Sequence, residues 1–259
     1  MKIAVIGKGG SGKTTISATL SRLLARRGLS VVAIDGDPNP NLAVALGVSA
    51  QQADRLQPLP TDLLKHVSDD EGALTLTITR TKNQLETECG AQAPDGVTLL
   101  LGGQVDAAGR GCLCSKHATV RGLMGEIVLE ERDVIVLDME ASIEHLSRGT
   151  IAHAERLLIV IEPYYRALET AGRIARLAPQ LGIPDVMAIG NKVRGGEDEA
   201  AIRAYCAQHD LPIGAMVPYD DQVGQADRRG MALLDYAPDS PAVSAIAQLS
   251  SRLAGLTSS

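Results

Sequence analysis

A glycine-rich stretch near the start of the chain, GKGGSGKT at residues 7–14, carries the strongest chemical signal in the sequence. It fits the pattern G-x-x-x-x-G-K-[ST], whose backbone N–H groups wrap a phosphate while the lysine reaches the β- and γ-oxygens and the hydroxyl is offered to Mg²⁺. A glycine-rich turn without a ligand needs neither the lysine nor the threonine. The stretch therefore predicts a site for ATP or ADP with Mg²⁺, built from Gly9, Gly10, Ser11, Gly12, Lys13, Thr14 and Thr15.

Carboxylates follow two apolar runs that are typical of strands. Asp35 and Asp37 lie in AIDGDPNPN, and Asp138 lies in VIVLDMEASIEH. Ligands of a parallel sheet bind beyond the carboxyl ends of its strands, so we expect these acids to converge on the phosphate loop. Without that loop, each aspartate could equally be a helix cap or a turn residue.

Two of the four cysteines, Cys112 and Cys114, stand one residue apart in GRGCLCSKH. In an extended segment residues i and i+2 face the same side, so both thiolates could bind one ion. Thiolates suit Zn²⁺, Ni²⁺, Cu⁺ or iron–sulfur clusters, and structural zinc takes four ligands, so a second copy of the chain would supply the other two. The alternative is a pair of partly buried thiols without a metal. His117 is a candidate accessory ligand, and we expect no metal role for Cys89 and Cys206.

These residues need a sheet to position them. Short, continuous apolar runs rich in β-branched residues are typical of strands covered on both faces, and here they alternate with amphipathic segments such as residues 14–28. That alternation predicts an α/β fold, a doubly wound, mostly parallel sheet with helices on both faces. A closing helix is expected within 240–259, an extra strand within 73–81 and a turn or loop at 90–96. The main strands are expected at residues 2–7, 30–35, 97–102, 133–138, 157–162, 186–191 and 212–218.

Lys8 places a second lysine at the start of the loop. The stretch KGGSGKTT resembles the deviant Walker A loop of a family of P-loop NTPases that includes septum-placing and plasmid-partition ATPases, nitrogenase iron protein and metal-cluster maturation ATPases. The resemblance implies that Lys8 reaches across a homodimer to the partner's nucleotide; otherwise it is a solvated surface lysine. It also implies that Asp138 holds Mg²⁺ through water beside Thr14, and that Asp37 orients the attacking water.

The same family has an asparagine after a late strand and a segment that closes over the adenine. In this chain the matching residues are Asn191, in VMAIGNK, and Pro218, in VPYDDQV. Asparagine at a strand end is also common in turns, so the asparagine alone does not predict a base contact. Asp220 and Asp221 could equally be a solvated pair.

The run DMEASIEHLSRGT, together with GRGCLCSKH and DGDPNPNL, is similar to the nickel-insertion ATPases that mature nickel-dependent carbon monoxide dehydrogenase. This resemblance covers essentially the whole chain. It implies a metallochaperone that carries Ni²⁺ on Cys112 and Cys114 of both subunits, hydrolyses ATP to open and close the dimer, and serves carbon monoxide dehydrogenase. Thiolate chemistry alone leaves Zn²⁺ equally open.

Two departures from that family concern the rate of hydrolysis and the cysteine loop. Ser142 stands where the second switch usually has glycine, and Ser115 stands where proline commonly follows the second cysteine. The nearby Glu140, Glu144 and His145 either sense the nucleotide state or simply cap and solvate the next helix.

The composition of the chain limits which functional classes and partners remain. The formal net charge of −6 and the absence of Phe and Trp disfavour nucleic-acid and anionic-membrane partners. No apolar run approaches the roughly 18 residues that span a bilayer, and no signal-peptide pattern opens the chain, so we expect a cytoplasmic protein with one domain over residues 1–259. The alternatives are a positioning or partition ATPase, an electron-transfer ATPase with a [4Fe–4S] cluster, and a maturation ATPase for another enzyme.

Overall fold

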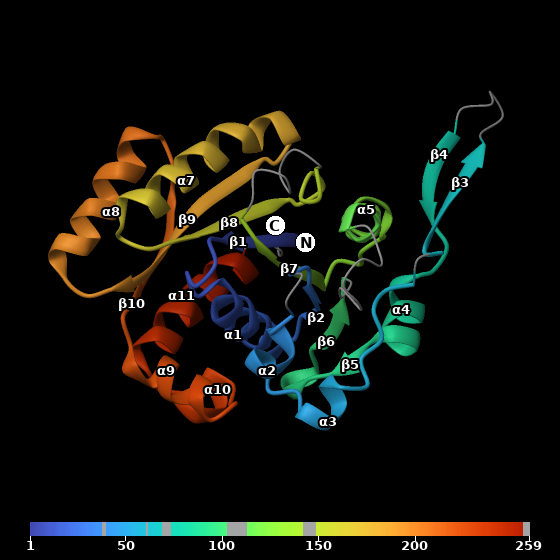
Figure 1. Cartoon of the computed structure of the whole chain (residues 1–259), viewed down its shortest axis with the longest axis horizontal. Coiled ribbons are helices and arrows are strands. Elements are labelled where there is room, and N and C mark those ends of the chain that lie inside the picture. Colours follow the sequence, from blue (N-terminus) through green and yellow to red (C-terminus); the bar gives the residue numbers. More distant parts are fainter. Residues whose placement is uncertain (38–39, 61, 69–73, 103–112, 142–148, 256–259) are drawn as a thin grey trace.

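The computed structural model describes residues 1–37, 40–60, 62–68, 74–102, 113–141 and 149–255. Through these residues runs an eight-stranded sheet in the order β10-β9-β8-β1-β7-β2-β6-β5 (Figure 1). Its neighbouring strands are parallel except for β5, which pairs antiparallel with β6. The doubly wound, mostly parallel sheet predicted from the sequence is confirmed.

Every strand expected from a continuous apolar run is present, as is the extra strand expected within 73–81, which is β4. The structure corrects the expectation of a turn or loop at 90–96, because this segment holds the short strand β5 and a 3₁₀ helix, η1. β3 was not predicted. The strands are β1 (Lys2–Gly7), β2 (Ser30–Asp35), β3 (Leu64–Ser68), β4 (Leu74–Ile78), β5 (Ala91–Gln92), β6 (Thr98–Leu101), β7 (Asp133–Glu140), β8 (Arg156–Ile161), β9 (Asp185–Val193) and β10 (Ile213–Pro218).

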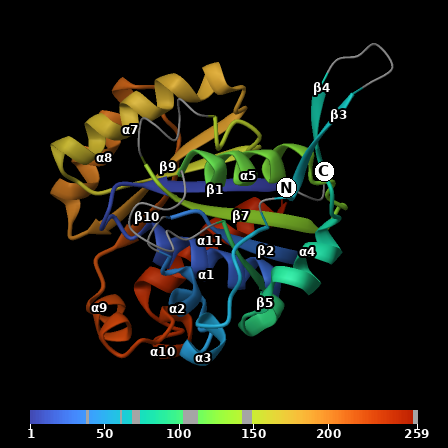
Figure 2. The same cartoon turned by 45° about the vertical axis from the view of Figure 1, so that its right-hand side comes forward.

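Helices cover both faces of the sheet (Figure 2). On one face lie α1, α2, α10 and α11, and on the other lie α4, α5, α7 and α8. The described helices are α1 (Lys13–Arg26), α2 (Leu42–Leu46), α3 (Ala50–Ala53), α4 (Lys82–Cys89), η1 (Pro94–Gly96), α5 (Leu113–Glu126), α7 (Tyr165–Leu177), η2 (Ala178–Leu181), α8 (Gly196–Gln208), α9 (Asp221–Arg228), α10 (Leu233–Tyr236) and α11 (Pro241–Gly255).

The core consists of two apolar layers, one on each face of the sheet. Successive strand residues point to opposite faces, so Ile3 and Val5 of β1 pack in the layer of α1 and α11, while Ala4 and Ile6 pack in the layer of α5, α7 and α8. Burial on both faces explains why the strands read as continuous apolar runs instead of alternating ones.

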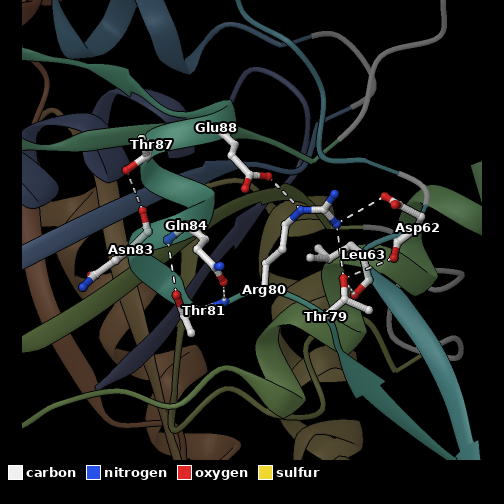
Figure 3. A network of polar contacts seen from close by, with 9 residues as sticks. All are labelled: Asp62, Leu63, Thr79, Arg80, Thr81, Asn83, Gln84, Thr87 and Glu88. Carbon is white, nitrogen blue, oxygen red and sulfur yellow. Dashed lines mark hydrogen bonds and ion pairs between the residues drawn. The ribbon is translucent and has the colours of Figure 1, made fainter.

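A hairpin of β3 and β4 forms a separate antiparallel sheet that projects from the main body (Figure 1). Polar contacts fix its base: the Thr79 N–H donates to the Leu63 carbonyl at 2.8 Å, and the Arg80 guanidinium reaches Asp62 at 3.2 Å and Glu88 at 2.8 Å (Figure 3). Among the described residues, no helix is both long and apolar enough to cross a membrane.

Candidate nucleotide site

The phosphate loop connects β1 to α1 through a tight turn. The Ser11 N–H donates to the Lys8 carbonyl at 3.0 Å, and Gly10 and Gly12 have φ of 80° and 89°, in the left-handed region that favours glycine. A side chain at Gly12 would also collide with the amide of Asn191. Glycine at positions 10 and 12 is therefore favoured by the backbone itself, apart from any ligand.

Helix α1 begins without a side-chain cap. Its N-cap is Gly12, and its first turn contains no acidic residue. The first N–H groups of such a helix lack intrahelical acceptors and carry the positive end of the helix dipole. This arrangement favours an anion such as a phosphate at the loop. The helix is anchored in the core through Ile16, Leu20 and Leu24.

The sheet register brings the predicted magnesium acid to this loop. Asp138 is fully buried at the carboxyl end of β7, the neighbour of β1. Its carboxylate accepts hydrogen bonds from the Thr14 hydroxyl at 2.8 Å and the Ser17 hydroxyl at 3.0 Å. Burial raises the pKa of Asp138, although Lys13 and both hydroxyls act in the opposite direction. Thr14 and Asp138 thus lie together, as the sequence predicted.

Lys13 and Asp37 form an ion pair with 2.8 Å between Nζ and Oδ2. Burial alone would lower the pKa of Lys13, but Asp138 and the hydrogen bond with Asp37 outweigh it, and the pKa is raised. The lysine is therefore a permanent cation at the phosphate loop. Asp37, predicted to orient water, lies within reach of the same site.

Asp35 shapes the segment after β2. Its carboxylate accepts the backbone N–H of Asp37 at 3.1 Å and that of Leu42 at 2.8 Å, which ties the start of α2 to the end of β2. Burial, reinforced by the nearby Asp138, raises the pKa of Asp35 to about 7, although the Leu42 N–H acts in the opposite direction. Asp35, Asp37 and Asp138 converge near the phosphate loop as expected, but the Asp35 carboxylate binds backbone N–H groups of its own segment.

A cavity of about 250 Å³ adjoins the loop and brings Asn191 and Pro218 together. The Asn191 side-chain amide donates to the Ser11 carbonyl at 2.6 Å, so this residue supports the loop as well as lining the cavity. Both residues predicted from the adenine-binding pattern thus share one cavity, and they share it with the loop residues Gly12 and Thr15.

The acidic pair after Pro218 has partners within the protein. Asp220 caps α9 by accepting the Gln222 N–H at 2.9 Å, and Asp221 accepts the Tyr219 hydroxyl at 3.1 Å. The Arg194 guanidinium lies 4.0 Å from the Tyr219 ring centroid, a cation–π contact at the cavity wall.

Three residues of the site were missed by sequence reasoning. Ser17 contacts Asp138, and Lys192 joins the Gly10 carbonyl to Glu162 with distances of 2.6 and 2.8 Å from its Nζ. For Ser17 a signal was available, because a residue three positions after Thr14 shares its face of the helix. For Lys192 no such signal exists, because a regular strand would direct it away from Asn191.

Two residues near the turn of the phosphate loop were named for roles in partner contact or nucleotide sensing, Lys8 and Glu140. Lys8 is exposed at the turn of the phosphate loop. Glu140 ends β7 close to this loop, since a Cβ built on Gly9 would lie 3.4 Å from its Oε1.

The structure describes only part of the predicted metal site. Cys112 lies outside the described residues, and Cys114 lies in the first turn of α5, where its side chain is not described. The helical backbone of Leu113 and Cys114 corrects the expectation of an extended segment. Among the side chains that the structure describes, no three His, Cys, Asp or Glu gather into a metal site.

Of the other residues discussed for the metal site or the second switch, some are described by the structure and others are not. Burial raises the thiol pKa of Cys89 and of Cys206, which keeps both protonated at neutral pH. The side chains of Ser115 and His117 are not described, although both residues belong to α5. Ser142, Glu144 and His145 lie outside the described residues.

Comparisons with known proteins agree with this geometry. The family model for the CobQ/CobB/MinD/ParA nucleotide binding domain matches residues 2–234. The carbon monoxide dehydrogenase accessory protein CooC of Rhodospirillum rubrum is 41% identical over 92% of this chain and 91% of its own length. An uncharacterised ATP-binding protein of Methanocaldococcus jannaschii is 37% identical over 89% of this chain and 90% of its own.

A solved structure shows the same fold. The septum site-determining protein MinD of Pyrococcus horikoshii, complexed with Mg-ADP, superimposes with a TM-score of 0.71. The match covers 99% of both chains at 22% identity.

Proposed function

The chain belongs to the CobQ/CobB/MinD/ParA nucleotide-binding family, and on that premise we propose that it hydrolyses ATP to deliver Ni²⁺ to a carbon monoxide dehydrogenase. The observation that carries the nucleotide half of the proposal is the pairing of Lys13 with Asp37 and of Thr14 with Asp138 at one loop. The similarity to CooC and the spacing of Cys112 and Cys114 support the client and the cargo.

The donor set at the loop fits magnesium. The Thr14 hydroxyl and the Asp138 carboxylate lie 2.8 Å apart, and oxygen donors of these types are the ones that Mg²⁺ prefers. These two residues would hold the ion, which supplies charge neutralisation on the β- and γ-phosphate oxygens when bound. The cavity beside Asn191 and Pro218 would take the adenine.

In the proposed reaction the protein groups position the phosphates and the water. Lys13 and the N–H groups of the loop bind the β- and γ-phosphates of ATP. A phosphate that shares Lys13 weakens its hold on the Asp37 carboxylate, which then orients the water that attacks the γ-phosphorus. ADP and phosphate are the products.

The nickel half of the proposal requires a second copy of the chain. One chain offers two closely spaced thiols, which are too few for a four-coordinate site. Two chains that close over ATP, each with Lys8 reaching the partner's nucleotide, would bring Cys112 and Cys114 of both into one site for Ni²⁺. Hydrolysis opens the pair and releases the ion to the client.

The test combines metal binding with oligomeric mass. Equilibrium dialysis against Ni²⁺, with Mg-ATP present, is expected to give one ion per two chains, and light scattering the mass of a dimer. The variant Cys112→Ser/Cys114→Ser is expected to lose the ion but keep ATP binding, whereas Cys89→Ser serves as the matched control and keeps both. Tight Ni²⁺ binding by the double variant would refute the cysteine site.

Lys8 and the client are tested separately. Lys8→Ala is expected to bind ATP and remain monomeric, and a normal ATP-dependent dimer would contradict the bridging role. The nickel-loaded protein is expected to activate nickel-free carbon monoxide dehydrogenase faster with ATP than with ADP. Equal activation with both nucleotides would count against delivery driven by hydrolysis.

A partition or positioning role is less well supported. In α11 the guanidinium of Arg252 donates to the Gly214 carbonyl, and Ile246, Leu249 and Leu253 are buried against the sheet. The described part of this helix carries a single basic residue and buries its apolar face, unlike a membrane anchor. Sedimentation with anionic vesicles or with DNA is expected to leave the protein in the supernatant.

A further inference from the structure

Two consecutive residues at the end of β9 hold two consecutive carbonyl groups of the phosphate loop. The Asn191 amide donates to the Ser11 carbonyl, and the Lys192 amino group donates to the Gly10 carbonyl, each at 2.6 Å. In a regular strand, neighbouring side chains point to opposite faces of the sheet. A local departure from strand geometry must therefore turn Lys192 toward the loop.

That departure is visible in the backbone. Lys192 has φ of 57°, in the left-handed region that few residues other than glycine adopt. The pairing of β9 with β10 also shifts here, because Gly190 pairs with Met216 and Val193 with Pro218, so β9 contains one extra residue. Such a bulge re-aims side chains and is common beside active sites. The left-handed conformation of a lysine costs roughly 1–2 kcal/mol.

The amino group of Lys192 also has an anionic partner. Glu162, which directly follows β8, lies 2.8 Å from Nζ, and its side chain is only 17% exposed. The carboxylate holds the amino group over the loop, so the contact to Gly10 does not depend on a freely moving side chain. Glu162, Lys192 and Gly10 form a chain of contacts across β8, β9 and the loop after β1.

The contacted carbonyl belongs to a peptide that defines the loop. The Gly10 carbonyl and the Ser11 N–H are parts of one trans peptide and point in opposite directions. That N–H closes the turn onto the Lys8 carbonyl at 3.0 Å. Likewise, the Ser11 carbonyl held by Asn191 sets the direction of the Gly12 N–H.

We propose that Lys192, held by Glu162, is a positioning residue for nucleotide binding, which fixes the Gly10–Ser11 peptide and thereby the arrangement of loop N–H groups that receives the phosphates. The inference rests on the nucleotide-binding half of the proposed function and is independent of nickel. The two contacts of Lys192, to the Gly10 carbonyl and to Glu162, are called the clamp below. The clamp explains why a lysine occupies this left-handed position, because a glycine would relieve the strain but lose both contacts.

The test compares affinity with stability in four variants. Lys192→Met and Lys192→Gly are expected to bind Mg-ADP about tenfold more weakly by calorimetry, which corresponds to about 1.4 kcal/mol. Lys192→Gly is expected to unfold at the same or higher urea concentration than the unchanged chain, because it removes the left-handed strain. Lys192→Arg is expected to retain most of the affinity. Lys65→Met, at an exposed position of β3, is the matched control and binds normally.

The outcomes separate this inference from the proposed function. If the unchanged chain and Lys192→Met bind Mg-ADP equally tightly, the clamp is refuted and nucleotide binding stands. If Lys192→Gly is as stable as expected and also binds Mg-ADP with normal affinity, the side chain of Lys192 has no role in nucleotide binding. A chain that binds no adenine nucleotide at all overturns both proposals. In steady-state hydrolysis, the clamp predicts a rise in KM for ATP that exceeds the fall in kcat.

Discussion

Single residues at the phosphate loop are already fixed by contacts within the protein, before any ligand binds. Gly12 is left-handed, caps α1 and lies against the Asn191 amide, so the motif's glycine is fixed by local geometry. Asp138 has hydrogen-bond partners in Thr14 and Ser17, and Lys13 has one in Asp37. These contacts position the functional side chains of the site, and each contact can be tested by a single substitution.

Gly12→Ala tests the close approach of Asn191. Any alanine in a left-handed position costs about 1–2 kcal/mol, and Gly182, with φ of 74° and open space around it, provides the matched control. Gly12→Ala also displaces the Asn191 amide from the Ser11 carbonyl, which adds about 1–3 kcal/mol. Urea unfolding of both variants measures the difference, and equal losses would contradict the contact.

Asp35 makes stability depend on pH. Its folded-state pKa of about 7 lies above its ordinary value of 3.8, so between these values the folded chain binds a proton that the unfolded chain has lost. The free energy of unfolding therefore falls as pH rises from about 4 to about 7, with a slope of at most about 1.4 kcal/mol per pH unit from this group. In magnesium-free and nucleotide-free buffer, Asp35→Asn is expected to flatten this dependence; an unchanged slope would show that Asp35 keeps its ordinary pKa.

Helix α1 links the phosphate loop to η1 and α10. One turn before its end, the buried Arg22 binds Asp95 of η1 at 2.6 Å and Asp235 of α10 at 2.6 Å. Arg26, on the same helix, also binds Asp95 at 3.0 Å, but its side chain is 43% exposed. The two arginines share one acid and differ in burial.

Arg22→Met is expected to destabilise the chain by about 2–3 kcal/mol, because Asp95 and Asp235 lose their buried cationic partner and can only partly rehydrate. Arg26→Met is expected to cost less than about 0.5 kcal/mol, as exposed ion pairs do. Urea unfolding compares the pair. A similar, small loss in both would mean that the buried network adds nothing beyond packing.

Strands buried on both faces were predictable from the sequence, whereas of the remaining strands β4 was expected but β3 and β5 were not. The seven apolar strands of the main sheet were expected because their residues face two helical layers. β3, with the sequence LKHVS, lies in the projecting hairpin and lacks a continuous apolar run. β5 has only two residues, too few for any periodicity.

At the site, the motif residues were predictable, but the supporting lysine, Lys192, was not. Lys13, Thr14 and Asp138 follow from a pattern in the sequence. Lys192 reaches the loop only because a bulge reverses its direction, and no rule of strand alternation predicts a left-handed lysine.

At the scale of the whole molecule, the candidate cavity connects distant parts of the chain. Its lining includes Gly12 from the loop, Asn191 from β9, Pro218 from β10 and Ile246 from α11. A ligand bound there would stabilise the N-terminal and C-terminal parts together.

Mg-ADP at a hundred times its dissociation constant is expected to add about 2.7 kcal/mol, which raises Tm by roughly 5–10 °C in a chain of this size. Calorimetry with and without the nucleotide measures the shift. Lys13→Ala, compared with itself in the same way, is expected to show a much smaller shift. A full shift in that variant would place the nucleotide away from the loop.

The order of the strands has a consequence for synthesis on the ribosome. β1 precedes the other described strands and, among them, pairs with β7 and β8, whose residues begin at Asp133 and Arg156. Until β7 is synthesised, the apolar strand KIAVIG can pack against α1 but has no native strand neighbour, and it must avoid non-native association. The nascent chain can acquire its phosphate loop only late, when β8 has left the exit tunnel.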